Sequence, residues 1–97
     1  MPFEIILAPE AAEDLAGLKA NLRAEVRGGI ETHLRNEPQK VSRSRIKRLK
    51  KLSQPQYRLR IGDVRVFYDV SENSVEVLAI VFKPEAATWL TKHGKSE

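Results

Sequence analysis

The strongest constraint on the fold is a run of alternating apolar and polar residues from 57 to 70, interrupted only by Gly62-Asp63. Alternation with a period of two is the pattern of a strand that is buried on one side. A two-residue loop at Gly62-Asp63 would join two such strands and set their register, so that Ile61 faces Val64 and Tyr57 faces Tyr68. The sequence therefore predicts an antiparallel hairpin over these residues.

This register divides the hairpin into two faces. The first, here called the helix-pair face, consists of Tyr57, Leu59, Ile61, Val64, Val66 and Tyr68. The second, the arginine face, consists of Arg58, Arg60, Arg65 and Phe67. Because Arg60 and Arg65 are expected to lie directly opposite each other, their repulsion would cost the sheet up to about 1 kcal/mol. We expect the helix-pair face to pack against helices and the arginine face to be open to solvent.

The N-terminal third predicts a strand followed by two helices. A short apolar run at 3–7 predicts the strand, and Pro9 with the acidic residues after it predicts a helix start. Apolar residues recur every four positions from 22 to 34, which predicts a second helix that ends before Pro38. Asn21 is its expected N-cap.

Two glycines and two later segments complete the predicted order. Gly28-Gly29 falls inside the second helix, where we expect it to allow close packing of the two helices. The nearly continuous apolar run at 75–82 predicts a central strand, and residues 85–92 predict a turn or short helix. The order β-α-α-β-β-β predicts an α+β fold, with a small antiparallel sheet packed against an N-terminal helix pair, as one domain over 1–97.

Charge is distributed unevenly along the 97 residues, whose net charge is +4. Residues 40–65 contain ten Lys or Arg and one acidic residue, and seven of these bases fall between Lys40 and Lys51. Such an excess predicts a polyanionic partner. A charged strand face is also commonly just a solvated face, and charge alone does not distinguish RNA, DNA or an acidic protein.

Several kinds of chemistry are excluded or find no support. Without cysteine there is no disulfide, thiolate metal site or cysteine nucleophile. His33 and His93 belong to no metal-binding or triad spacing, and no phosphate-binding loop motif occurs, so we expect neither metal nor cofactor. The longest apolar run has six residues against the about twenty of a membrane helix, and the N-terminus does not resemble a signal peptide. The expectation is a cytoplasmic protein without a membrane partner.

The hairpin sequence Tyr-Arg-Leu-Arg-Ile-Gly-Asp-Val-Arg-Val-Phe-Tyr-Asp-Val resembles the RelE/ParE toxin superfamily. In that superfamily a Tyr-Arg-Leu-Arg-x-Gly-Asp-x-Arg-x-x-Tyr pattern is common. The basic segment at 45–52 and the helix start at 8–15 are also similar, so the resemblance spans residues 3 to about 90. It implies a RelE-like fold and the toxin of a type II toxin–antitoxin system.

The resemblance also implies roles for single residues. Arg60, Arg65 and Lys83 would stabilise the charge that develops when a ribose 2′-hydroxyl attacks the adjacent phosphate. The residues implied to hold RNA phosphates are Arg43, Arg45, Lys47, Arg48, Lys50, Lys51 and Arg58, and those implied to stack on a base are Phe67 and Trp89. Trp89 occupies the position of a catalytic tyrosine in the best-studied branch, so the groups that transfer protons stay unidentified.

The first functional hypothesis is therefore a RelE-like, ribosome-dependent mRNA endonuclease that inhibits translation, with the ribosome and mRNA as partners. The resemblance further implies a cognate, acidic antitoxin, and contact with operator DNA only through the antitoxin complex. One alternative is a ParE-type inhibitor of DNA gyrase. Another is an inactive nucleic-acid-binding relative.

Overall fold

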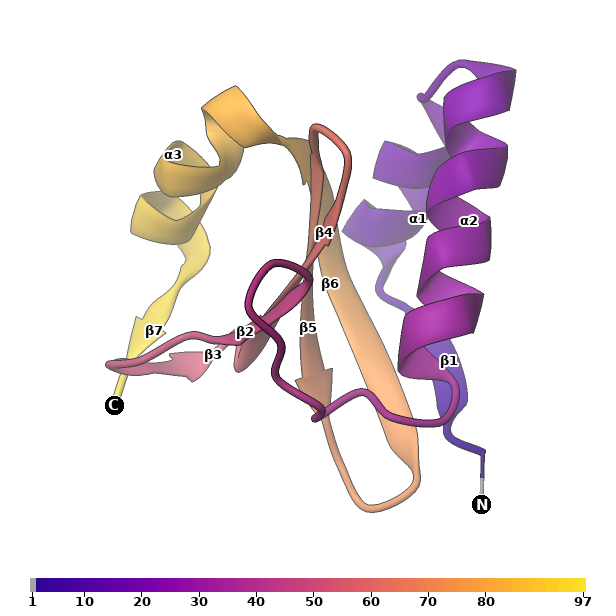
Figure 1. Cartoon of the computed structure of the whole chain (residues 1–97). Helices are drawn as coiled ribbons and strands as arrows, with labels where there is room; N and C mark the ends of the chain where they lie inside the picture. The colour runs from indigo at the N-terminus through magenta and orange to yellow at the C-terminus, as the bar shows by residue number, and fades with distance from the viewer. Residues whose placement is uncertain (1) are drawn as a thin grey trace.

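A computed structural model describes residues 2–97 (Figure 1). The helices are α1 (Pro9–Ala16), α2 (Ala20–Leu34) and α3 (Lys83–His93). The strands are β1 (Glu4–Leu7), β2 (Ile46–Arg48), β3 (Leu52–Gln54), β4 (Tyr57–Ile61), β5 (Val64–Val70), β6 (Ser74–Phe82) and β7 (Lys95–Ser96). The α+β class is confirmed, and the short strands β2, β3 and β7 are additions to the predicted order.

Five strands form the main sheet in the order β1-β6-β5-β4-β2, and β3 pairs with β7 in a separate small sheet. The predicted hairpin register is confirmed at all five pairs, from Ile61 opposite Val64 to Tyr57 opposite Tyr68. The sheet is mixed rather than wholly antiparallel, because β1 runs parallel to β6. The connection from β1 to β6 runs through residues 8–73, which include both helices and β2 to β5, and is long enough for such parallel pairing.

The core lies between the sheet and the helix pair. In Figure 1, α1 and α2 lie on one side of the sheet and α3 lies on the other. Leu15, Val26 and Leu34 on the helices belong to one buried cluster with the helix-pair face, where only Tyr57 is half-buried. Burial of that face is thus confirmed. The Tyr68 hydroxyl is buried as well and donates a 2.7 Å hydrogen bond to the Pro38 carbonyl.

Two local predictions about α2 are wrong. The residue at its N-cap is Lys19, which makes no side-chain capping bond, and Asn21 lies inside the first turn. Gly29 allows close packing on the sheet rather than between the helices, and Gly28 takes no part in it. A Cβ atom on Gly29 would lie 2.6 Å from Ile61 Cδ1, whereas one on Gly28 would meet nothing within 4 Å.

The C-terminal part crosses the opposite side of the sheet and returns to the strands. α3 packs on β5 and β6, and β7 then pairs with β3 in the separate small sheet. The Asp69 carboxylate holds the chain near β3 by accepting bonds from Gln56 N at 2.8 Å and Gln54 Nε2 at 2.6 Å. Within residues 2–97, no helix is long and apolar enough to cross a membrane.

Candidate nucleic-acid interface

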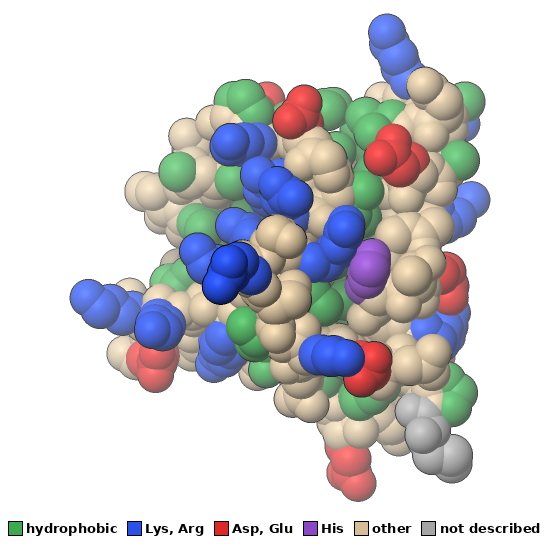
Figure 2. All heavy atoms as spheres, viewed as in Figure 1, with side chains coloured by type: hydrophobic (Ala, Val, Ile, Leu, Met, Phe, Trp, Pro, Cys, Tyr) green, Lys and Arg blue, Asp and Glu red, His purple; other side chains and the backbone are tan. Residues whose placement is uncertain are grey.

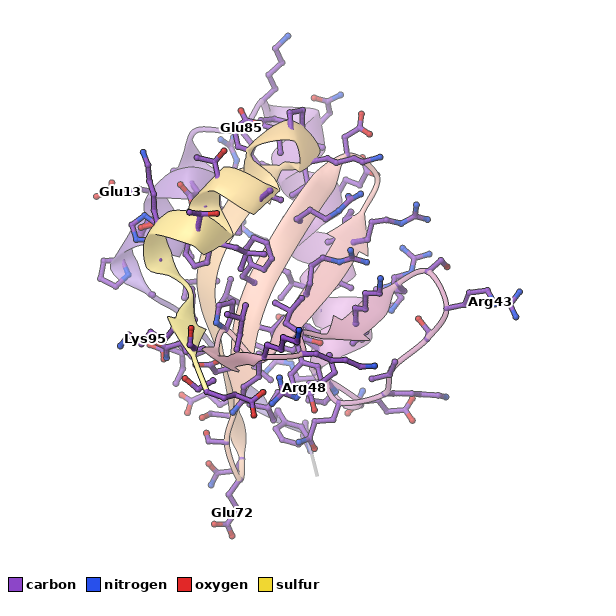
Figure 3. All side chains as sticks on the ribbon, turned by 90° about the vertical axis from the view of Figure 1, so that its left-hand side faces the viewer. Glu13, Arg43, Arg48, Glu72, Glu85 and Lys95 are labelled. Carbon is purple, nitrogen blue, oxygen red and sulfur yellow. The ribbon has the colours of Figure 1, made fainter. Side chains whose placement is uncertain are left out.

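The arginine face lies on the side of the sheet that carries α3, and Figure 3 looks onto it. Arg60 pairs with Arg65 across the hairpin, and Arg58 pairs with Phe67. On its other side Arg58 pairs with Lys47 of β2, so two like charges lie directly opposite each other there as well. Regular strand geometry therefore concentrates four cations on three neighbouring strands.

Part of this face is covered, and the expectation that it is open is wrong for Phe67 and Arg65. Phe67 has no exposed surface, because Trp89 of α3 stacks on its ring with 5.1 Å between centroids and 9° between planes. Arg65 is only 7% exposed, and its Nη1 donates to the carbonyls of Gly62 at 2.9 Å and Val64 at 3.2 Å. Covering an aromatic ring on the second face is favourable for the same reason that the core is.

Arg58 is the least satisfied side chain on the arginine face. Its Nε is buried and has no hydrogen-bond partner among residues 2–97. Burial and the nearby Arg65 and Arg60 guanidinium groups lower the pKa of Arg58. The salt bridges found among the described residues are Arg35 with Glu31 and Lys40 with Glu37, so no carboxylate pairs with these three arginines. The arrangement provides hydrogen-bond donors and charge for an anion.

Lys83 and Trp89 are the candidate residues on α3. Lys83 is the first helical residue, and its backbone N–H donates to the Asp63 carbonyl at 2.7 Å, so the helix starts beside the hairpin loop. Its side chain is exposed. Trp89 is half-buried, and its Nε1 donates to Glu10 Oε2 at 3.3 Å while His93 lies 5.0 Å away on the ring. These contacts position α3 over Phe67.

The basic segment is divided between different surfaces. Arg45 approaches the arginine face, since its Nη1 donates to the Arg60 carbonyl at 3.4 Å. Arg48 lies over the Tyr57 ring at 5.4 Å and donates to the Gln56 carbonyl at 2.8 Å, which places it toward the helix-pair face. Arg43, Lys50 and Lys51 are exposed in the loops, and Figure 3 shows Arg43 pointing away from the sheet.

Groups that transfer protons at neutral pH are absent from the arginine face, which contains only arginine and phenylalanine. The two tyrosines lie on the helix-pair face, stacked with 5.4 Å between their centroids. Burial raises the pKa of Tyr68 above its ordinary value, which keeps its hydroxyl protonated. Residues 2–97 contain no group of three His, Cys, Asp or Glu side chains that could hold a metal ion.

The fold is that of RelE proteins, as three solved structures show. The chain is similar to the RelBE2 toxin–antitoxin complex from Mycobacterium tuberculosis, with a TM-score of 0.69, 21% identity, and 84% of this chain and 99% of that chain covered. The RelB–RelE complex from Methanococcus jannaschii is similar with a TM-score of 0.64 and 17% identity, and 87% of this chain and 96% of that chain are covered. The RelE–RelB complex from Pyrococcus horikoshii OT3 is similar with a TM-score of 0.60 and 23% identity, and 86% of this chain and 97% of that chain are covered.

The family itself is shown by sequence. The model of the family described as ParE toxin of type II toxin-antitoxin system, parDE, matches residues 5–83. The chain therefore belongs to this family of toxins, within the RelE/ParE superfamily. No curated protein matches the chain.

Proposed function

We propose that this toxin inhibits translation by binding mRNA on the ribosome and cleaving it, with the arginine face around the scissile phosphate. The observation that carries the proposal is the buried, unpartnered Nε of Arg58 beside Arg60 and Arg65. Guanidinium groups are well matched to phosphate oxygens in geometry and charge. A cluster that has no carboxylate partner within residues 2–97 is expected to bind such an anion strongly.

In the proposed reaction the ribose 2′-oxygen forms a bond to phosphorus as the bond from phosphorus to the 5′-oxygen breaks, which gives a 2′,3′-cyclic phosphate and a 5′-hydroxyl. The 2′-hydroxyl proton passes to water, and the leaving 5′-oxygen takes a proton from water. Negative charge accumulates on the phosphate oxygens, and Arg60 and Arg65 would stabilise it. Arg65 is held in place by its two backbone carbonyl acceptors, so it needs no reorganisation. Lys83 would assist from the start of α3. Much of the rate would come from positioning on the ribosome, because the face itself offers no proton-transfer group.

The remaining candidates would bind RNA outside the reaction centre. Arg45 and Lys47 adjoin the arginine face and would hold neighbouring phosphates with Arg58. Trp89 would stack on a base only if His93 moved from its ring, since Phe67 and His93 both contact that ring. Phe67 supports Trp89 rather than contacting RNA. The exposed Arg43, Arg48, Lys50 and Lys51 would add long-range attraction.

Inhibition of DNA gyrase is the second candidate function. Two observations favour it: the matching family is described by the ParE toxin, and the arginine face lacks a proton acceptor. In this case the same face would bind a protein or DNA surface without chemistry.

We further propose that an acidic antitoxin neutralises the toxin by supplying the carboxylates that the arginine face lacks. The solved structures of similar fold include complexes of RelE with RelB. If charge carries the contact, the affinity of the purified pair falls as salt rises, because screening weakens interactions between exposed charges. An affinity that does not change with salt would contradict an electrostatic contact.

The target is tested by expressing the toxin from a tightly controlled promoter in a permissive bacterium. The informative variant is Arg60→Gln, and Arg43→Gln is its control, because both remove one exposed cation but only Arg60 lies on the arginine face. We expect growth arrest, with mRNA ends mapped within codons, for the wild type and the control but not for Arg60→Gln. Arrest with DNA damage and intact mRNA would identify gyrase as the target. Absence of arrest by the wild type would indicate an inactive relative.

A further inference from the structure

A hollow of about 300 Å³ lies at the β2 edge of the sheet, on the side that carries α2, between the end of α2 and the loop that leads to β2. Its lining residues are Thr32, His33, Glu37, Lys40, Ser42, Arg45 and Ile46. Figure 2 shows Lys and Arg side chains gathered over this side of the molecule, around β2, β4 and the preceding loop. Neither the sequence patterns nor the proposed reaction uses this hollow.

The hollow presents hydrogen-bonding groups that lack partners. Ser42 Oγ accepts bonds from the backbone N–H groups of Arg45 at 3.0 Å and Ile46 at 3.2 Å, which fixes the loop. Its own hydroxyl proton has no acceptor among residues 2–97, and the side chains of Thr32 and His33 make no hydrogen bond within that range either. Three neutral polar side chains therefore line the hollow without satisfying one another.

The charges of the hollow favour an anion on one side and a neutral polar group on the other. Lys40 and Arg45 are cations, and the acidic Glu37 is paired with Lys40 at 3.7 Å. Burial and the charge of Arg45 lower the pKa of His33, so its imidazole is neutral at pH 7 and both donates and accepts hydrogen bonds.

Arg45 connects the hollow to the arginine face. Its side chain lines the hollow, and its Nη1 donates to the carbonyl of Arg60 at 3.4 Å. The backbone N–H of Arg60 in turn donates to the Arg45 carbonyl at 2.8 Å, so the two residues are fixed relative to each other. A chain of phosphates that crosses the arginine face would therefore reach the hollow by passing round the β2 edge of the sheet at Arg45.

We propose that the hollow binds one nucleotide of the single-stranded RNA that crosses the arginine face, at the point where the RNA passes round the β2 edge of the sheet. Lys40 and Arg45 bind the phosphate of that nucleotide, and His33, Thr32 and Ser42 hydrogen-bond to its base or ribose. The volume is at the lower end of the about 300–1,000 Å³ of small-molecule sites, which suits a single nucleotide. This inference rests on the proposed function for its RNA substrate and adds to it a site for the flanking nucleotide.

The two histidines of the chain provide the test by NMR, because His33 lines the hollow and His93 lies on α3. The full chain, made by cell-free synthesis with labelled histidine, is titrated with adenosine 5′-monophosphate and separately with a five-nucleotide RNA. We expect both ligands to shift the imidazole signals of His33, and the mononucleotide to leave those of His93 in place. If the imidazole signals of His33 shift in neither titration, the inference is overturned. An equal shift caused by an oligoglutamate peptide of matched charge would also overturn it.

A matched pair of variants separates the site from general attraction. Arg45→Gln and Arg43→Gln each remove one cation from the same loop, but only Arg45 lines the hollow. We expect Arg45→Gln to weaken binding of the five-nucleotide RNA by about tenfold and Arg43→Gln by less than about threefold. Equal losses would overturn the inference. Cleavage of mRNA in cells is measured separately. A shift of the His33 signals without cleavage would reject the proposed reaction and keep the site. Cleavage without a shift of the His33 signals would keep the reaction and reject the site.

Discussion

The two faces of the β4–β5 hairpin differ in how completely their side chains are satisfied. Leu59 on the helix-pair face has no exposed surface and belongs to the core cluster, and Tyr68 there has a partner for its hydroxyl. Arg58, the neighbour of Leu59 in sequence, has a buried Nε without a partner and lies opposite Lys47. The first face stabilises the fold, whereas the second retains an electrostatic cost that is typical of a functional surface.

This difference predicts that substitutions at adjacent positions change the stability of the protein in opposite directions. On the helix-pair face, removal of atoms leaves cavities or unpaired polar groups, so stability falls. On the arginine face, removal of charge relieves repulsion among cations, so stability is kept or rises while function is lost. Substitutions on the two faces can therefore test this difference.

The largest effect is expected for Leu59→Ala. The side chain is fully buried between the sheet and the helices, and leucine-to-alanine changes in cores cost about 2–5 kcal/mol. Urea denaturation followed by circular dichroism measures the loss. A cost below about 1 kcal/mol would mean that the helix-pair face is not the main stabilising surface.

Next in size is Tyr68→Phe, which removes the 2.7 Å bond to the Pro38 carbonyl and leaves that buried acceptor unpaired. We expect a loss of about 1–2 kcal/mol in the free energy of unfolding. The control is Tyr57→Phe, because Tyr57 lies on the same face but its hydroxyl makes no hydrogen bond to the described residues. Equal losses for the two variants would show that the bond to Pro38 contributes nothing.

Tyr68 also predicts how stability depends on alkaline pH. Its pKa is raised by burial, so the folded state favours the protonated hydroxyl. The contribution of Tyr68 is therefore fully present below the unfolded pKa of about 10 and is lost as the pH rises beyond it. Unfolding measured at pH 9 and pH 11 should show a smaller loss of stability for Tyr68→Phe than for the wild type.

On the arginine face, Arg58→Met is expected to change stability by a smaller amount and in the opposite direction. Methionine keeps much of the side-chain length but removes the charge opposite Lys47 and the buried Nε without a partner. We expect stability to rise by up to about 1 kcal/mol, with growth arrest lost. Arg43→Met, on the exposed loop, should leave stability unchanged and weaken growth arrest only slightly, because Arg43 adds only long-range attraction for RNA. Destabilisation by Arg58→Met would show that the guanidinium supports the fold, and the contrast between the faces would fail.

The sequence was sufficient for the features that depend on local rules. The hairpin register follows from a two-residue loop and strand alternation, and all five of its pairs are present. Coverage of the arginine face could not be found in this way, because the Phe67–Trp89 contact depends on where α3 lies after it leaves β6. The sequence did contain one indication of this coverage: Phe67 lies among arginines, and an aromatic ring is costly to expose to water.

The hollow was missed for a similar reason. Its lining comes from the last turn of α2 and from a loop without periodicity, and these segments meet only because the chain turns back to add β2 to the sheet edge. His33 in sequence is an isolated histidine near a helix end. Only the fold brings Lys40 and Arg45 next to it.

The smallest effect concerns α2, which covers the helix-pair face. Gly28 and Gly29 are adjacent helical residues, but a Cβ on Gly28 would meet nothing within 4 Å, whereas one on Gly29 would press on Ile61 Cδ1 at 2.6 Å. Alanine is preferred over glycine inside helices by about 0.5–1 kcal/mol, so Gly28→Ala should stabilise the protein by that amount. For Gly29→Ala the same gain is offset by the displacement of Ile61, which makes the variant neutral or destabilised. Parallel thermal melts measure the difference, and equal stabilisation by both would mean that α2 does not pack closely on this face.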